Sequence, residues 1–183
     1  MSEIHTLSAF ARRLAALLLL LAASVLILPA ITAPAWATPE EDLVEVHKME
    51  LEGNKVGAFL KLKELAPQGD AAAQWKLGGY YQYGWAGPAN FALAREWYGR
   101  AARQGLPDAM LGLAVMSAQG QGGPVDIKSA FVWLTVASRL IQDPQEVQNV
   151  NGLRDKYKSE MSSADLNAAV LLSLGYQTER LLG

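Results

Sequence analysis

The sequence of 183 residues contains no cysteine. This absence excludes disulfide bonds, cysteine nucleophiles and thiolate metal sites, so packing alone must hold the fold together. Histidine is nearly as scarce, because His5 and His47 are the only two in the chain. Since no second histidine or cysteine stands near His47, we expect no metal site, no catalytic residue set and no cofactor.

An excess of positive charge is also missing. The chain has 16 lysine and arginine residues against 18 aspartate and glutamate residues. The lysines between residues 48 and 63 are interleaved with glutamates, a pattern that favours a solvated helix surface over a basic patch. We therefore expect no nucleic-acid partner.

One long hydrophobic run lies near the N-terminus. Residues 14–28 are apolar except for one serine, they follow Arg12 and Arg13, and a small-residue triplet ends at Ala37. A basic start, a short apolar core and an A-x-A site are typical of a signal peptide, here residues 1–37. We expect cleavage after Ala37, a periplasmic or secreted protein, and no stable membrane span afterwards. The alternative is an uncleaved signal that anchors the protein in the inner membrane.

The rest of the chain repeats with a period of 36 residues. Small, aromatic and turn-forming residues recur at this shift in two central segments. The matching pairs include Ala73 and Ala109, Leu77 and Leu113, Gly84 and Gly120, Pro88 and Pro124, Trp97 and Trp133, and Ala101 and Ala137. A fixed period of this length is the signature of a repeat architecture.

Each repeat contains the signals of two helices. The same 36-residue shift relates Asn54, Asn90, Asp126 and Ser162, all of which can cap a helix N-terminus. Residues 4, 8 and 12 positions after each cap form one stripe on a helix, and we expect that stripe to be buried. The preceding helices are predicted at residues 40–51, 71–83, 107–119 and 145–158, and glycines at 84 and 120 end the central two.

These patterns predict an all-α fold. We expect residues 38–183 to form a short α/α solenoid of about four helix–turn–helix repeats, with a tetratricopeptide-like superhelix. The units fall near residues 38–69, 70–105, 106–141 and 142–183. Each unit leaves an apolar face bare, and stacking buries that face against the next unit.

The central residues resemble a known repeat family, the Sel1-like repeat, which is related to the tetratricopeptide repeat. The resemblance covers about 70 residues. The third unit departs from the family pattern at Ala114 and Ser117, where the pattern has Gly and Tyr. The resemblance rests on Ala73, Leu77, Gly78, Tyr81, Gly84, Asn90, Ala94, Trp97, Tyr98, Ala101, Ala102 and Gly105. It implies a non-catalytic adaptor, and exported bacterial members are involved in envelope assembly, signalling control or host contact.

In tetratricopeptide-like stacks the first helices line a concave groove, which is where we expect a partner to bind. The candidate contacts lie on the face of each first helix that does not pack within its unit. They are Trp75, Gly79, Gln82 and Tyr83, then Leu111, Val115 and Gln119, and His47 one repeat earlier. Trp85, in the loop, is a further candidate contact. Trp75 and Tyr83 could equally be core residues, and Trp85 could fold back over the stack.

Three functional hypotheses follow. The first is an exported scaffold that binds a protein segment through the groove, as a monomer or a dimer. The second is a cell-wall glycan or polysaccharide module, because four aromatic side chains cluster at Trp75, Tyr80, Tyr83 and Trp85. The third, a carboxylate-dependent hydrolase, is least favoured because the acidic residues fall at helix ends or outer faces.

The predicted signal peptide leads to a first testable prediction. If the protein is expressed from its full sequence in a bacterial host, the exported chain should begin at Thr38, because processing follows Ala37. Intact mass measurement and N-terminal sequencing of the periplasmic fraction check this. A full-length chain found in the inner membrane would support the anchor instead.

Overall fold

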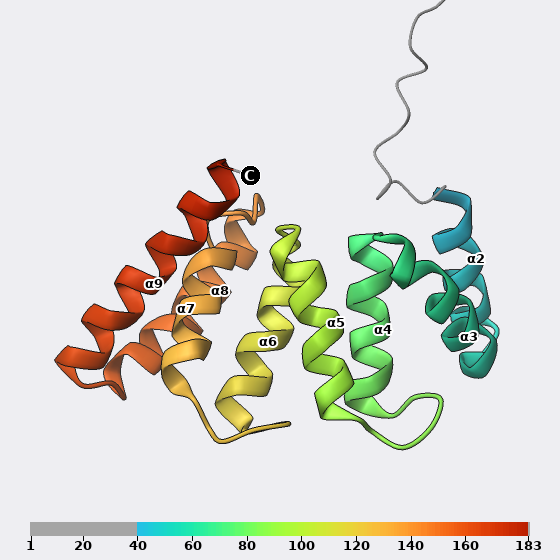
Figure 1. Ribbon diagram of the computed structural model, residues 1–183, viewed down its shortest axis with the longest axis horizontal. Helices are drawn as coiled ribbons and strands as arrows, with labels where there is room; N and C mark the ends of the chain where they lie inside the picture. The colour runs from blue at the N-terminus through green and yellow to red at the C-terminus, as the bar shows by residue number, and fades with distance from the viewer. Residues whose placement is uncertain (1–39, 183) are drawn as a thin grey trace, which may run out of the picture. The chain divides into compact units, whose positions relative to one another are not determined.

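The computed structural model describes residues 40–182, with side chains over residues 42–176. The expected signal peptide and its cleavage site lie outside this part. The described residues belong to one compact unit, in which the helices follow one another in chain order from α2 to α9 (Figure 1). Residues 40–182 contain eight α-helices and one short 3₁₀ helix, and no strand. The predicted all-α solenoid is therefore confirmed.

The helices alternate between first and second members of each repeat. The first members are α2 (Glu40–Leu51), α4 (Ala71–Tyr83), α6 (Pro107–Gln119) and α8 (Pro144–Ser159). The second members are α3 (Lys55–Leu65), α5 (Phe91–Arg103), α7 (Ile127–Ala137) and α9 (Ser163–Leu182), with η1 (Ala66–Gln68) after α3. These bounds agree closely with the ranges predicted from the sequence.

The four predicted caps open the four second helices. The side chains of Asn54, Asn90 and Asp126 each accept a hydrogen bond from the backbone N–H three residues later. Ser162 does the same, accepting from the N–H of Asp165 at 3.1 Å. Each bond satisfies a backbone donor that a helix N-terminus leaves free, which explains why the period is strictest at these positions.

Glycines end the two central first helices, as predicted. Gly84 and Gly120 have φ values of 65° and 67°, in the left-handed region that closes a helix without steric cost only for glycine. The loop after each returns to its own helix, because Asn90 N–H donates to Tyr81 O and Asp126 N–H donates to Ser117 O. The same turn is therefore built twice, one repeat apart.

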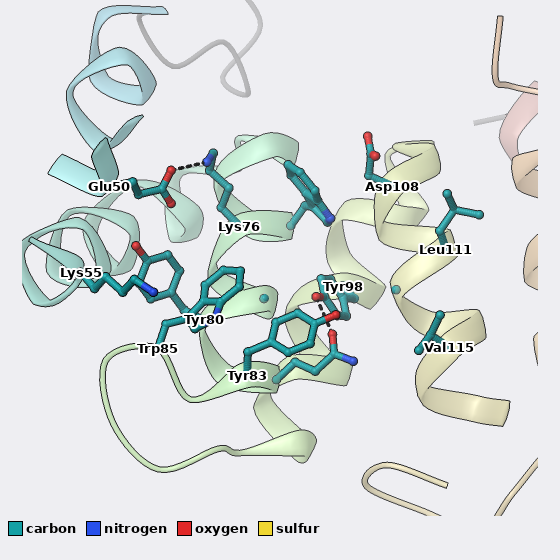
Figure 2. Close-up of a pocket in the computed structure, with 14 residues that line it drawn as sticks. Glu50, Lys55, Lys76, Tyr80, Tyr83, Trp85, Tyr98, Asp108, Leu111 and Val115 are labelled. Carbon is teal, nitrogen blue, oxygen red and sulfur yellow. Dashed lines mark hydrogen bonds and ion pairs between the residues drawn. The ribbon is translucent and has the colours of Figure 1, made fainter. Parts of the chain in front are cut away.

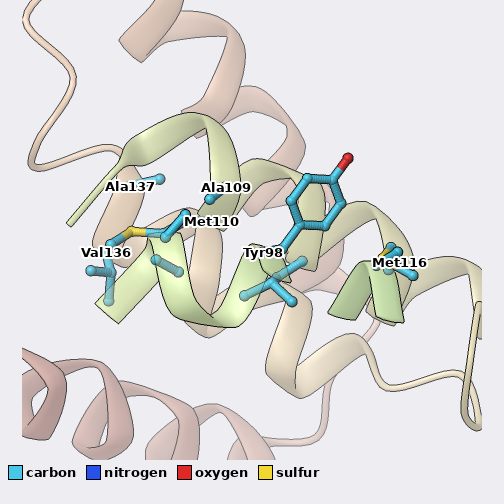
Figure 3. Close-up of a cluster of buried hydrophobic side chains, with 10 residues drawn as sticks. Tyr98, Ala109, Met110, Met116, Val136 and Ala137 are labelled. Atoms are coloured by element: carbon cyan, nitrogen blue, oxygen red, sulfur yellow. The ribbon is translucent and has the colours of Figure 1, made fainter. Parts of the chain in front are cut away.

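The central core lies where α5, α6 and α7 meet. Tyr98, Ala109, Met110, Met116, Val136 and Ala137 are among its buried members (Figure 3). The stripe predicted on the second helices is buried as expected in the first three units, where Ala58, Ala94 and Ala130 are fully buried. Alanine at this position lets neighbouring helices approach closely.

Tyr98 of α5 is wedged between two first helices. A Cβ atom added to Gly78 of α4 would lie 2.6 Å from Cδ1 of its ring, and one added to Gly112 of α6 would lie 2.9 Å from Cε2. Neither contact is compatible with a side chain on the helix. The two glycines therefore hold α4 and α6 against opposite parts of one aromatic ring.

The fourth unit departs from the predicted pattern. α8 and α9 both pack on α7 and make little contact with each other, whereas α4 packs on α5 and α6 packs on α7. Among the α9 residues up to Tyr176, whose side chains the structure describes, Ala169 and Ser173 are buried, and the predicted Val170 and Leu174 are 41% and 46% exposed. That part of the prediction is wrong, because α9 packs mainly on α7 and so presents a different side to the core.

The packing of Tyr98 between Gly78 and Gly112 leads to a prediction about stability. Gly78→Ala should lower the free energy of unfolding by about 1–3 kcal/mol, because the new methyl group clashes with the ring of Tyr98. The matched control is Gly152→Ala in α8, where a Cβ would meet nothing within 4 Å. This control should instead gain about 0.5–1 kcal/mol from helix propensity. Urea denaturation of both variants measures the free energy of unfolding. Equal changes in the two variants would contradict the close contact between Gly78 and Tyr98.

Candidate functional site

A pocket of about 500 Å³ opens on the side formed by the first helices α4 and α6. It has an aromatic wall, an aliphatic wall, a polar floor and a charged rim (Figure 2). The aromatic wall is contributed by α4 and the loop after it, and the aliphatic wall by α6. This is the face that tetratricopeptide-like stacking assigns to a groove.

The aromatic wall consists of Trp75, Tyr80, Tyr83 and Trp85. The rings of Tyr83 and Trp85 stack with centroids 5.1 Å apart, and Tyr80 meets the edge of Trp85 at 5.2 Å. Tyr83 and Trp85 remain 59% and 46% exposed. The loop residue Trp85 thus folds back over α4 and still offers one side to solvent, while Trp75 is half-buried against the central core.

The opposite wall is formed by Leu111 and Val115, one helical turn apart on α6. Both side chains are half-buried, so part of each apolar surface faces the pocket. Gly79 lies at the base of the aromatic wall, where an added Cβ would be 3.6 Å from Cζ3 of Trp85. The lack of a side chain there leaves room between the rings.

The floor is polar and fully hydrogen-bonded. The hydroxyl of Tyr98 donates to Oε1 of Gln82 at 2.8 Å, and Nε2 of Gln82 donates to Oε1 of Gln121 at 2.8 Å. Gln82 is only 4% exposed. Because each of its amide atoms already has a partner, Gln82 fixes the floor more than it offers free hydrogen-bonding groups to a ligand.

The rim carries charges of both signs. Nζ of Lys76 lies 2.8 Å from Oε2 of Glu50, so these two charges neutralise each other. Nζ of Lys55 lies 5.5 Å from the centroid of a ring of Trp85, within reach of a cation–π interaction. Asp108 stands in the first turn of α6, where the helix dipole favours a negative charge. The rim thus presents a cation beside the aromatic wall and a carboxylate on the α6 side.

Two pocket tyrosines are held in the neutral form. Burial raises the pKa of Tyr80 to about 12, and the negative charge of Glu50 adds to this effect. Burial likewise raises the pKa of Tyr98 far above its ordinary value. Both hydroxyls therefore keep their protons at neutral pH, and neither is a base there.

The structure brings together most of the groove residues predicted from sequence. Trp75, Gly79, Gln82, Tyr83, Leu111 and Val115 line the pocket together with Trp85. Gln119 is exposed and lies outside the lining. His47 is also exposed, with its Nδ1 3.8 Å from Oε2 of the rim residue Glu50. That these side chains contact a partner stays a prediction.

Sequence reasoning missed several lining residues. It assigned Tyr98 to the core stripe and Lys55 to a solvated surface, and it did not single out Lys76 or Gly112. The 36-residue shift gives no signal for Gly112, because Lys76 occupies the equivalent position. The pocket is therefore less periodic than the framework that carries it.

The described residues contain no cluster of three or more side chains suited to hold a metal ion. The pocket lining has no histidine, and its two carboxylates come from α2 and α6. The helices in the described part of the chain are too short or too polar to span a membrane. The arrangement is suited to binding an apolar group between two walls and charged groups at the rim.

Two comparisons with known proteins found matches. The family described as "Sel1 repeat" matches residues 71–106 and 107–140. A crystal structure of a Sel1 repeat protein from Oxalobacter formigenes is 33% identical in sequence, with a TM-score of 0.48. That match covers 54% of this chain and 29% of the other chain. No curated protein matches the sequence.

The raised pKa of Tyr80 generates a prediction about alkaline pH. The unfolded chain loses this proton near pH 10 and the folded chain near pH 12, so stability should fall as the pH rises through this window. Tyr80→Phe should make the fall less steep, while the exposed control Tyr83→Phe should keep the wild-type slope. Urea unfolding between pH 9 and 11.5 measures the slopes, and identical slopes for all three proteins would contradict the burial.

Proposed function

Because the chain is a Sel1 repeat protein, with repeats at residues 71–106 and 107–140, we propose that it is an exported, non-catalytic scaffold. It binds a segment of a protein partner in the pocket between α4 and α6. Sel1 repeats typically mediate protein interactions, which supports the general role. The specific observation that carries the proposal is the pairing of an exposed aromatic wall with an aliphatic wall across one pocket.

The shape of the pocket suits an apolar anchor side chain from the partner. Aromatic residues supply much of the binding energy at protein interfaces, and Tyr83 and Trp85 are already stacked and need little ordering. The hydrogen-bonded floor of Gln82 and Tyr98 keeps the walls in place. A preformed pocket of this kind loses little conformational entropy when it is filled.

The charged residues at the rim of the pocket indicate which charges a bound segment should carry. Lys55 has no ion-pair partner among the described residues, and neither has Asp108, whereas Lys76 is neutralised by Glu50. A bound segment with an acidic group near Lys55 and a basic group near Asp108 would complement both. Such rim contacts contribute more to orientation and association rate than to affinity.

Export is supported by the N-terminal pattern of Arg12, Arg13, an apolar run and a small-residue site before Thr38. The absence of cysteine is compatible with this route, because no disulfide has to form. The partner would accordingly be an envelope or secreted protein. Intact mass measurement and N-terminal sequencing of the periplasmic protein test whether the chain is exported and cleaved.

A glycan-binding role is the second candidate, because sugar faces stack on aromatic rings. The stacked pair Tyr83 and Trp85 offers such a platform. Tyr80, however, is only 3% exposed, so the aromatic cluster provides a smaller platform than the sequence suggested. The walls of Leu111 and Val115 are also apolar, which suits a side chain better than a hydroxylated ring.

The protein-binding proposal predicts a specific in-cell crosslink. A photo-crosslinking amino acid placed at Tyr83 should capture a partner of defined mass, whereas the same amino acid at Val125, an exposed loop residue outside the pocket lining, should not. Mass spectrometry then identifies the captured segment. Equal capture at both positions, or at neither, would contradict the pocket as the binding site.

Affinity for the captured segment should depend on the anchor residues. Replacing both Trp75 and Tyr83 by Ala should weaken binding by more than about 30-fold, because aromatic hot spots contribute about 2 kcal/mol or more. The matched control is Phe91→Ala, which removes a partly exposed aromatic ring outside the lining. Calorimetry measures all three proteins. Saturable binding of wall fragments, abolished by the same double replacement, would favour the glycan role.

A further inference from the structure

A second apolar surface lies at the C-terminal end of the stack, on α9. It consists of Ala168, Leu171, Leu172, Gly175 and Tyr176, and is called the α9 face here. All five residues are exposed, with Leu171 and Leu172 at 69% and 53%. Terminal helices of repeat arrays usually present a polar outer side to water. The α9 face breaks this rule.

The α9 face is firmly attached to the rest of the stack. On the inner side of the helix, Ala169 and Ser173 are fully buried. The ring of Tyr176 packs on Trp133 of α7, with centroids 4.8 Å apart. The exposed leucines therefore stand on a fixed helix that has already buried its inward side.

Charge is missing along the whole length of this face. No charged residue occurs in the sequence between Asp165 and Glu179. A surface without charge complements itself, because two copies can meet without repulsion and without needing a partner of opposite charge. Asp165, at the start of the helix, lies 3.6 Å from Nζ of Lys128.

We propose that the α9 face is a homodimer interface, on which a second copy of this chain packs through its own α9 face. The apolar area is on the order of 400 Å² per copy, the size at which an exposed patch is often functional. In a two-fold symmetric dimer, the apolar areas of both copies and the polar residues around them would together bury about 1,000 Å². This is the lower limit for a specific interface. A dimer of moderate affinity follows, with a dissociation constant on the order of micromolar.

The two α9 helices run antiparallel in this dimer. A parallel arrangement would bring the Asp165–Lys128 pairs of both copies side by side, with like charges facing each other, which costs energy. An antiparallel arrangement separates them and centres the axis between Leu171 and Leu172. It also places Ala168 of one copy opposite Gly175 of the other, so that small residues meet at both ends of the leucine contact. The pocket between α4 and α6 is made of other helices, so dimerisation leaves it open.

The oligomeric state tests the proposal. Sedimentation equilibrium on protein produced from the full sequence should show a reversible monomer–dimer equilibrium. Leu172→Glu should raise the dissociation constant at least 10-fold, because two buried charges would meet at the axis. The matched control is Leu60→Glu on α3, where the leucine is 55% exposed. It should dimerise like the wild type, and circular dichroism confirms that both variants are folded.

The absence of native cysteine permits a test of the arrangement. When the single variants Ala168→Cys and Gly175→Cys are mixed under a mild oxidant, they should form a disulfide-linked heterodimer, and each alone should form little. Crosslinking of each variant with itself would overturn the antiparallel arrangement. A chain that stays monomeric at high micromolar concentration, or a dimer that Leu60→Glu dissociates and Leu172→Glu does not, would overturn the α9 interface.

Discussion

The contact on which the pocket between α4 and α6 depends is the insertion of Tyr98 between these two helices. Its ring rests against Gly78 on one helix and Gly112 on the other, at distances that no side chain at either position would permit. Its hydroxyl donates to Gln82 on the floor of the pocket. One side chain of a second helix thereby sets the separation of two first helices and orients the floor between them.

Arg95, three residues before Tyr98 on α5, supports this contact. Its Nε donates to the carbonyl of Gln121 at 2.7 Å, and its Nη2 donates to the carbonyl of Met116 at 3.2 Å. These carbonyls lie at the end of α6, where a helix leaves acceptors without intrahelical partners. Gln121 also accepts the hydrogen bond from Gln82. The loop after α6 is thus hydrogen-bonded to α5 and to the pocket floor, which connects the two repeats beside the pocket.

The two ends of the stack differ from its centre. α4 to α7 form two regular helix pairs with closely similar loops, and the Sel1 repeats match there. In the fourth unit, Val150 is the one buried hydrophobic residue of α8, and α9 also packs on α7. The consequence is an apolar outer side on α9, the proposed dimer interface, on other helices than those that form the pocket proposed to bind a partner.

The sequence by itself determined the local structure, because caps and turns are chemical requirements of a few adjacent residues. Asn54, Asn90, Asp126 and Ser162 had to accept backbone hydrogen bonds, and Gly84 had to adopt a positive φ, whatever surrounded them. The tertiary structure decided what depends on the distance between helices. Gly112 contacts Tyr98 only because α5 and α6 lie close together. Gln82, predicted to line the groove, is hydrogen-bonded in the pocket floor. On α9, Ala169 and Ser173 are buried in place of the predicted Val170 and Leu174. The 36-residue period cannot encode these features, because each arises where two non-equivalent side chains meet across the stack.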